Sequence, residues 1–221
     1  MEIRQKRLSI PLRQEALRDL EIGDVVYLDG LIFTGRIRFY ERAVLQGQAP
    51  PVDIAGTCNV NFHCSPAVRV EGPDAYYIAS VTGTASARFA KFLEPMFLTY
   101  GVKAIIGKGG MQPDIYRNVF KKHGAIYLLT VGYGLGALYG RQIEKVEEVH
   151  WREELGLAQA MWVIRVRDFG PLIVDCDLSG NSYQALMRES TGRSLEDILD
   201  TYPAPTLKRF GEIRSPRDDA M

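Results

Sequence analysis

The stretch that most constrains the fold lies between residues 75 and 98, where two apolar runs flank a short loop. Residues 75–81 are rich in aromatic and aliphatic side chains and predict a strand. Residues 89–98 have the composition of a helix. The loop between them, residues 82–88, contains only Thr, Gly, Ala, Ser and Arg. A strand that passes through such a loop into a helix is typical of an α/β fold.

The loop has the features of an anion site. The first backbone N–H groups of a helix have no partner within the helix, and the helix dipole favours negative charge there. Arg88 falls in the first expected helical turn and adds a forked cation that suits carboxylate or phosphate. The alternative is a helix capped by Ser or Thr, with Arg88 in solvent. The loop alone leaves both interpretations open.

Two further cations occupy similar places in the sequence. Residues 102–110 predict a strand that ends in a glycine-rich turn carrying Lys108. Gly107 and Gly109 would let the backbone approach a ligand closely, and ligands of α/β sheets bind at the carboxyl ends of strands. The spacing of a nucleotide P-loop is absent. Arg36 lies between a predicted strand and a predicted helix, and its alternative is a surface arginine.

The rest of the chain alternates strand and helix patterns, which predicts one α/β domain with a mixed central sheet. Further strands are expected near residues 7–12, 57–64, 125–131 and 146–149, and helices near 12–20, 37–45 and 113–122. Two strand pairs are expected to turn back on themselves, residues 25–28 with 31–34 through Asp29-Gly30, and residues 161–166 with 172–175 through residues 168–171. This predicts a single domain over residues 1–200, followed by an irregular tail over 201–221.

Composition excludes several classes of function. The 221 residues include 27 basic and 27 acidic side chains, so the formal net charge is zero, whereas nucleic-acid binding needs a basic surface. No run reaches the roughly 18 apolar residues of a membrane span, and no signal-peptide pattern follows the N-terminus. Residues 132–138 lack the third glycine of a dinucleotide-binding loop and predict a tightly packed helix instead. We expect a cytoplasmic protein without nucleic-acid or membrane partners.

The three cysteines do not form a recognisable metal pattern. Cys58, Cys64 and Cys176 are odd in number, and their spacing matches no zinc or disulfide framework. Three thiolates can in principle hold an iron–sulfur cluster with one open iron. Cys176, however, lies in an apolar strand pattern, as a buried small hydrophobic residue does. We therefore expect no metal ligands in this chain.

Several short strings, taken in order, resemble the beta subunit, equivalently the C-terminal domain, of the iron–sulfur class I fumarate hydratases and tartrate dehydratases. They are residues 23–30, 33–36, 83–88, 106–109, 132–138, 168–171 and 177–181. Each string alone is weak, but together in register they are specific. The resemblance implies a swivelling β/β/α domain, and a hydro-lyase that reversibly adds water to the double bond of a short dicarboxylate.

The resemblance also implies roles for particular residues. Thr84 matches the family's catalytic base, and Arg36, Arg88 and Lys108 match cations that bind the substrate carboxylates. The family's [4Fe-4S] cluster is held by an alpha region that this chain lacks, so an alpha subunit would supply it in a hetero-oligomer. A threonine hydroxyl is a weak base and needs cations or N–H groups that stabilise its anion.

The chain departs from the family pattern at three positions. An aspartate and a histidine near the first arginine are Ile37 and Tyr40 here, and a glutamate appears as Gln159. These changes weaken the case for fumarate itself and are compatible with a related dicarboxylate that carries an extra hydroxyl or methyl group. Three functions stay open: the substrate-binding subunit of a hydro-lyase, a non-catalytic paralogue that binds a small carboxylate or serves in assembly, and a phosphate- or nucleotide-binding enzyme that uses Lys108.

Overall fold

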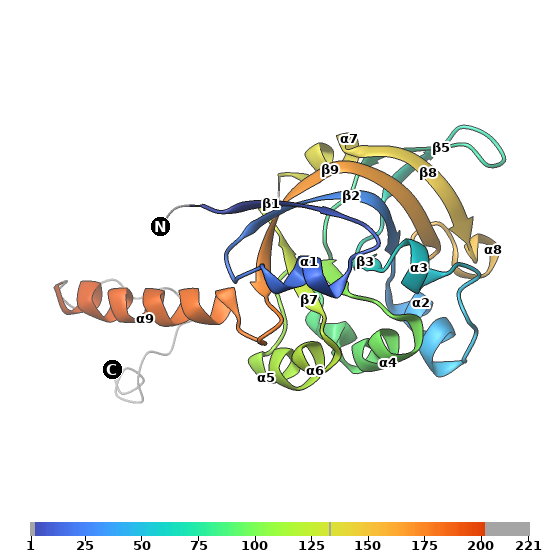
Figure 1. The fold of residues 1–221 in the computed structure, drawn as a ribbon. Helices are drawn as coiled ribbons and strands as arrows, with labels where there is room; N and C mark the ends of the chain where they lie inside the picture. The colour runs from blue at the N-terminus through green and yellow to red at the C-terminus, as the bar shows by residue number, and fades with distance from the viewer. Residues whose placement is uncertain (1–2, 133, 202–221) are drawn as a thin grey trace, which may run out of the picture. The chain divides into compact units, whose positions relative to one another are not determined.

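A computed structural model describes residues 3–132 and 134–201 (Figure 1). The chain divides into two compact units, Met1–Ala185 and Leu186–Met221, and the candidate site lies in the first. The expected division into a domain over residues 1–200 and a tail over 201–221 stays a prediction, because residues 202–221 lie outside the described part.

Strands and helices alternate along the first unit, as the sequence pattern predicts. The strands are β1 (Gln5–Ser9), β2 (Val25–Thr34), β3 (Val60–Phe62), β4 (Ala67–Val70), β5 (Tyr76–Ser80), β6 (Ala104–Gly107), β7 (Ile126–Thr130), β8 (Ile143–His150) and β9 (Met161–Cys176). The helices are α1 (Gln14–Arg18), α2 (Ile37–Tyr40), α3 (Ile54–Thr57), α4 (Ala90–Tyr100), α5 (Pro113–Ile115), α6 (Lys121–His123), α7 (Gly136–Arg141), α8 (Arg152–Leu155) and α9 (Tyr183–Thr201), with π-helical turns at Glu41–Leu45 and Tyr116–Phe120 and a 3-10 turn at Ala87–Phe89.

The main sheet is mixed and closes on itself. Its strand order is β1-β2-β3-β6-β7-β9-β8, and β2 also pairs with β9. Neighbours from β1 to β7 are parallel, whereas β9 is antiparallel to β2, β7 and β8. Because β9 pairs with both β2 and β7, the strands β2, β3, β6, β7 and β9 form a ring. The predicted α/β class with a mixed central sheet is confirmed.

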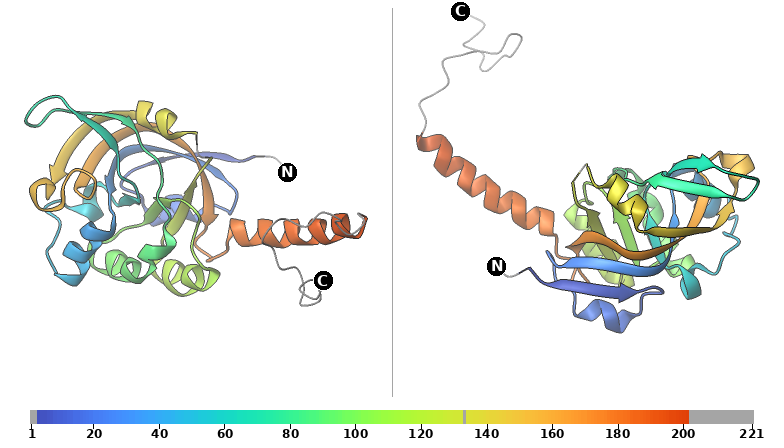
Figure 2. Two further views of the ribbon diagram at one scale, coloured as in Figure 1. Left: turned by 180° about the vertical axis from the view of Figure 1, so that it is seen from behind. Right: turned by 90° about the horizontal axis from the view of Figure 1, so that it is seen from above.

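The ring strands contribute to two separate cores, because successive side chains of a strand point to opposite faces. In β6, Ala104 and Ile106 belong to a core shared by all the ring strands, whereas Ile105 belongs to a second core beneath α2, α4 and residues 113–123. The helices α4, α5 and α6 lie together on one side of the ring, and α7 lies on the opposite side (Figures 1 and 2). The second core therefore anchors the helices that follow the strand ends.

The two predicted strand reversals are wrong, because β2 and β9 are each one long strand and pair with each other. The turn-like residues of the two strands lie opposite one another in this ladder. Leu28 pairs with Phe169 between two register shifts, and the Asp168 N–H donates to Asp29 Oδ1 at 2.7 Å. Gly30 and Asp168 have φ values of 126° and 52°. These residues form bulges that bend continuous strands.

The glycine-rich stretch over residues 132–138 leads into α7, which packs tightly as predicted, although its partner is β5 rather than the main sheet. A Cβ atom at Gly136 would lie 2.6 Å from Ser80 Oγ, and one at Gly140 would lie 2.5 Å from the Ala79 carbonyl oxygen. Only glycine allows α7 to lie this close to β5.

Within residues 3–132 and 134–201, no helix combines the length and apolar character needed to cross a membrane. The cytoplasmic location expected from the sequence stays a prediction.

Candidate functional site

The loop after β5 enters the main sheet, while β5 itself pairs only with β4. β3 pairs directly with β6 over the whole length of β3. Beyond the carboxyl ends of these two strands, the loop forms bridges with the residues that follow them. Gly83 forms a bridge with Cys64, which follows β3, and Ala85 forms a bridge with Lys108, which follows β6. The loop therefore acts as a short extra strand between the carboxyl ends of β3 and β6.

The backbone N–H groups of Thr84 and Ser86 are bonded to residues at the strand ends, so they do not form the expected open anion cradle. The Thr84 N–H donates to the His63 carbonyl at 2.7 Å, and the Ser86 N–H donates to the Lys108 carbonyl at 3.1 Å. The helix α4 begins only after an intervening 3-10 turn. Positive charge at the loop comes from side chains rather than from these N–H groups.

The four predicted site residues lie at one edge of the sheet. β2, β3 and β6 are parallel neighbours, so their carboxyl ends share an edge. Arg36 follows β2 and Lys108 follows β6, while Thr84 lies in the inserted loop and Arg88 in the turn after it. Two strand spacings of about 4.8 Å each lie between β2, which precedes Arg36, and β6, which precedes Lys108. This edge of the sheet therefore carries three cationic side chains and one hydroxyl group on neighbouring strand ends.

Arg88 folds back over the loop. Its Nη2 group donates to Thr84 Oγ1, and its Nε group donates to the Ala85 carbonyl at 3.2 Å. A guanidinium has five N–H donors, so these two bonds orient it and leave others for an anion. A cation on the Thr84 hydroxyl also favours the anionic form of that group, which is the form a base requires.

The two arginines each act electrostatically on one of His63 and Cys64, the two residues that directly follow β3. Burial, reinforced by the charge of Arg88, lowers the pKa of His63 to about 3. Burial raises the pKa of the Cys64 thiol well above its usual range, and the charge of Arg36 opposes that rise. Since His63 and Cys64 are adjacent, Arg36 and Arg88 lie around the same strand end.

A chain of buried polar side chains lies beneath the loop. Tyr127 Oη donates to Ser86 Oγ at 2.7 Å, and Ser86 Oγ lies 2.8 Å from His63 Nδ1. On the other side of the imidazole, Nε2 lies 2.6 Å from Tyr40 Oη, which lies 3.1 Å from Asn61 Oδ1. All five residues are buried. The sequence alone assigned none of them to the site. The polar residues Asn61 and His63, at alternate positions of an otherwise apolar strand pattern, were the available signal.

Gly107 leaves space for this buried chain rather than for a ligand. A Cβ atom there would lie 1.9 Å from Ser86 Oγ and 2.5 Å from Tyr127 Oη. We expect Gly107→Ala to lower the free energy of unfolding by about 2–4 kcal/mol, because overpacking adds to the loss of hydrogen bonds. Denaturant unfolding measures the change. The matched control is Gly134→Ala, since a Cβ at Gly134 meets nothing within 4 Å; equal stability of the two variants would contradict the prediction.

The three departures from the family pattern occupy different environments. The Tyr40 phenol is buried in the hydrogen-bonded chain described above. Gln159 Oε1 accepts from the Arg38 N–H at 3.4 Å, so it lies beside the start of α2, close to Arg36. Ile37 is the first residue of that helix. Tyr40 thus supports the site from below, while Gln159 and Ile37 lie near one of its cations.

A small cavity lies beside Lys108. It measures about 90 Å³ and is lined by Thr82, Gly83, Lys108, Thr130, Gly132, Gly136 and Tyr139. Pockets that enclose small-molecule ligands usually measure roughly 300–1,000 Å³. This cavity alone would therefore not enclose a dicarboxylate.

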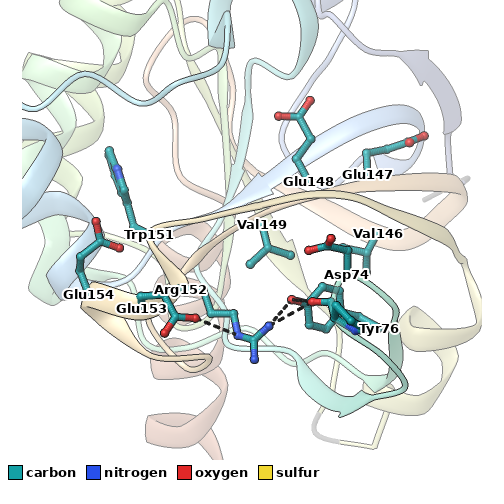
Figure 3. A pocket seen from close by; sticks show the side chains of 11 residues that line it. Asp74, Tyr76, Val146, Glu147, Glu148, Val149, Trp151, Arg152, Glu153 and Glu154 are labelled. Carbon is teal, nitrogen blue, oxygen red and sulfur yellow. Dashed lines mark hydrogen bonds and ion pairs between the residues drawn. The ribbon is translucent and has the colours of Figure 1, made fainter.

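A larger cavity of about 500 Å³ lies between the β4–β5 connection, β8 and α8, and it is acidic (Figure 3). Its lining includes the carboxylates of Asp74, Glu147, Glu148, Glu153 and Glu154. Among the described residues, the one arginine in this lining is Arg152. Its Nη1 group donates to Tyr76 Oη at 2.6 Å, and its Nε atom lies 3.9 Å from Glu153 Oε1. This excess of carboxylates disfavours the binding of a dianion in this cavity, although Glu147 and Glu154 are ion-paired with Arg165 and Arg42.

The cysteines do not fit a cluster held by this chain. Burial raises the pKa of the Cys58 thiol to about 11 and raises those of Cys64 and Cys176 further, whereas iron–sulfur clusters bind thiolates. Among the described residues, no three His, Cys, Asp or Glu side chains are grouped so that they could hold a metal ion.

Comparison with known proteins supports the resemblance seen in the sequence. Residues 2–186 match the family described as Fumarase C-terminus. The chain belongs to this family. Within the fumarase C-terminal family, it is 38% identical over 196 residues to the L(+)-tartrate dehydratase subunit beta of Escherichia coli (strain K12), covering 89% of this chain and 94% of that protein.

A second relative places the same unit in a longer chain. The protein named "Putative fumarate hydratase class I" of Geobacillus stearothermophilus is 33% identical over 193 residues, covering 87% of this chain but 36% of that protein. The fumarase C-terminal unit therefore occurs both as a chain of about this length and as one part of a larger polypeptide.

Proposed function

We propose that this chain is the beta subunit of a hydro-lyase that reversibly adds or removes water on a short dicarboxylate (fumarate/malate, tartrate or a close analogue). The observation that supports this most is the shared sheet edge of Arg36, Thr84, Arg88 and Lys108. The names of the relatives, a tartrate dehydratase subunit and a fumarate hydratase, support the reaction class.

The three cations would bind the two substrate carboxylates. Each guanidinium can donate two parallel hydrogen bonds to one carboxylate, and Lys108 adds a compact positive charge. Binding of a carboxylate by cations also disperses the negative charge that develops when a proton leaves the neighbouring carbon. The same contacts therefore hold the substrate and ease proton removal.

Thr84 would be the base in the dehydration direction. Its Oγ1 atom would take the proton from the carbon next to a carboxylate and return it during hydration. The hydrogen bond from Arg88 stabilises the Thr84 anion, so a group that is a poor base in water becomes usable here.

The rest of the site would come from a partner. The [4Fe-4S] cluster implied by the family would be carried by an alpha subunit, in agreement with the buried, protonated thiols of this chain. The small cavity beside Lys108 agrees with a substrate enclosed between two polypeptides.

The test is co-production with the alpha subunit of the same organism, followed by anaerobic assays on a panel of short dicarboxylates. We expect water addition or removal with the wild-type complex, near-complete loss with Thr84→Val and partial activity with Thr84→Ser. An assembled, cluster-bearing complex without activity on any dicarboxylate would favour the non-catalytic paralogue. Thermal stabilisation by nucleotides instead of dicarboxylates would favour the phosphate-binding alternative.

A further inference from the structure

We propose that the buried chain Tyr127–Ser86–His63–Tyr40 is a positioning network that holds Thr84 and Arg88 in register with Arg36 and Lys108. The inference rests on the function proposed above. None of the four network residues is assigned a contact with substrate, since the side chains of all four are buried.

The network joins the elements that carry the site. Ser86 lies in the loop, two residues from both Thr84 and Arg88. Its hydroxyl group forms hydrogen bonds with His63 and Tyr127. Tyr127 comes from β7 and His63 from the end of β3. Tyr40 ends α2, the helix that starts directly after Arg36. A displacement of Ser86 would therefore move the candidate base and its arginine together.

The hydrogen bonds run in one direction. Tyr127 Oη donates its proton to Ser86 Oγ at 2.7 Å. The Ser86 proton has two possible acceptors, His63 Nδ1 at 2.8 Å and the Thr84 carbonyl at 3.4 Å, and the shorter distance selects the imidazole. His63 then carries its hydrogen on Nε2.

The remaining bonds follow from that choice. His63 Nε2–H donates to Tyr40 Oη at 2.6 Å, and Tyr40 donates to Asn61 Oδ1 at 3.1 Å. Every hydroxyl and both imidazole nitrogens of the chain then have a partner, whereas the buried Asn61 Nδ2 group at its end makes no hydrogen bond to the described residues. A network satisfied in a single direction is rigid, and hydrogen bonds in series strengthen one another in a buried environment.

Rigidity matters here because the candidate base is a small side chain on a loop. Misplacement of a reacting group by about 1 Å can cost about 100-fold in rate. The alternative role is purely structural, in which the network only satisfies buried polar groups. That role predicts lower stability without a specific effect on turnover.

The experiment compares three Tyr→Phe variants of the full chain, assayed in the complex with the alpha subunit. Tyr127→Phe and Tyr40→Phe each remove one network hydroxyl. Tyr100→Phe is the matched control, because it removes a 2.8 Å hydrogen bond to the Ala43 carbonyl outside the network. We expect kcat to fall by about 10- to 100-fold in the first two, with KM within about threefold. The control should keep its kcat. Equal kcat in all three variants would overturn the proposal.

A second readout does not depend on activity. In the ¹⁵N-labelled full chain, NMR should show the His63 imidazole with its hydrogen on Nε2, and Tyr127→Phe should shift the Thr84 and Arg88 resonances while Tyr100→Phe does not. An Nδ1–H tautomer, or unchanged Thr84 and Arg88 resonances, would refute the network. Should the wild-type complex lack hydro-lyase activity, the proposed function fails while these NMR results still decide whether the network positions the loop.

Discussion

Replacing Arg88 by alanine is expected to lower kcat/KM for the dicarboxylate by about 30- to 1,000-fold in the assembled complex. This corresponds to about 2–4 kcal/mol of transition-state binding, as for a charge-assisted contact shielded from water. The effect is large because the guanidinium holds the Thr84 hydroxyl and, in the proposed mechanism, a substrate carboxylate as well. Steady-state kinetics with the wild-type substrate measures it.

The control is Arg167→Ala, since this side chain is 77% exposed and is ion-paired with Glu144. It should leave kcat/KM unchanged. A double variant with Thr84→Val adds a second criterion. If Arg88 acts partly through Thr84, the two losses are not additive. An Arg88→Ala complex as active as Arg167→Ala would remove Arg88 from the site.

The second large effect concerns the stability of the domain in acid. His63 is fully buried and its folded pKa is lowered to about 3, from an ordinary value of 6.5. Below pH 6.5 the unfolded chain binds a proton at His63 that the folded chain does not. Stability therefore falls with falling pH, by about 1.4 kcal/mol per unit and about 5 kcal/mol in all by pH 3. Above pH 6.5 this contribution is constant.

Denaturant unfolding at pH 7.0, 6.0 and 5.0 tests this slope, with His63→Gln as the reference variant. The range stops at pH 5.0 because Glu94 and Glu147 have lowered pKa values, and they lose their own stabilising contributions in stronger acid. We expect the wild type to lose more stability than the variant between pH 7.0 and 5.0. A His63 ring that titrates near pH 6.5 by NMR would contradict the prediction.

Local sequence patterns predicted most elements and the place of the cations. Arg36 and Lys108 each follow a strand that was recognised from its apolar residues, and parallel strands bring such positions to a common edge. The resemblance added Thr84 and Arg88. What local pattern could not supply was which strands are neighbours, since pairing depends on residues far apart in the chain.

The errors share this cause. Asp29-Gly30 and the residues around Asp168 have the composition of turns, but each faces the other across a ladder and forms a bulge instead. The loop carrying Thr84 was expected to offer free N–H groups, yet those of Thr84 and Ser86 donate to His63, after β3, and to Lys108, after β6. The hydrogen-bond partners of His63 are residues 40 and 86, and Ser86 is bonded in turn by residue 127; no local window contains these residues.

The closed ring has a consequence for how the chain is made. Val25 pairs with Ile173, and Thr130 with Leu172, so β9, the last strand of the ring in sequence, closes the gap between β2 and β7. During synthesis, β2 and β7 must wait with unsatisfied edges until that strand leaves the ribosome, and exposed edges invite association with other chains. The architecture that brings the cations together thus makes the nascent polypeptide dependent on late residues for its solubility.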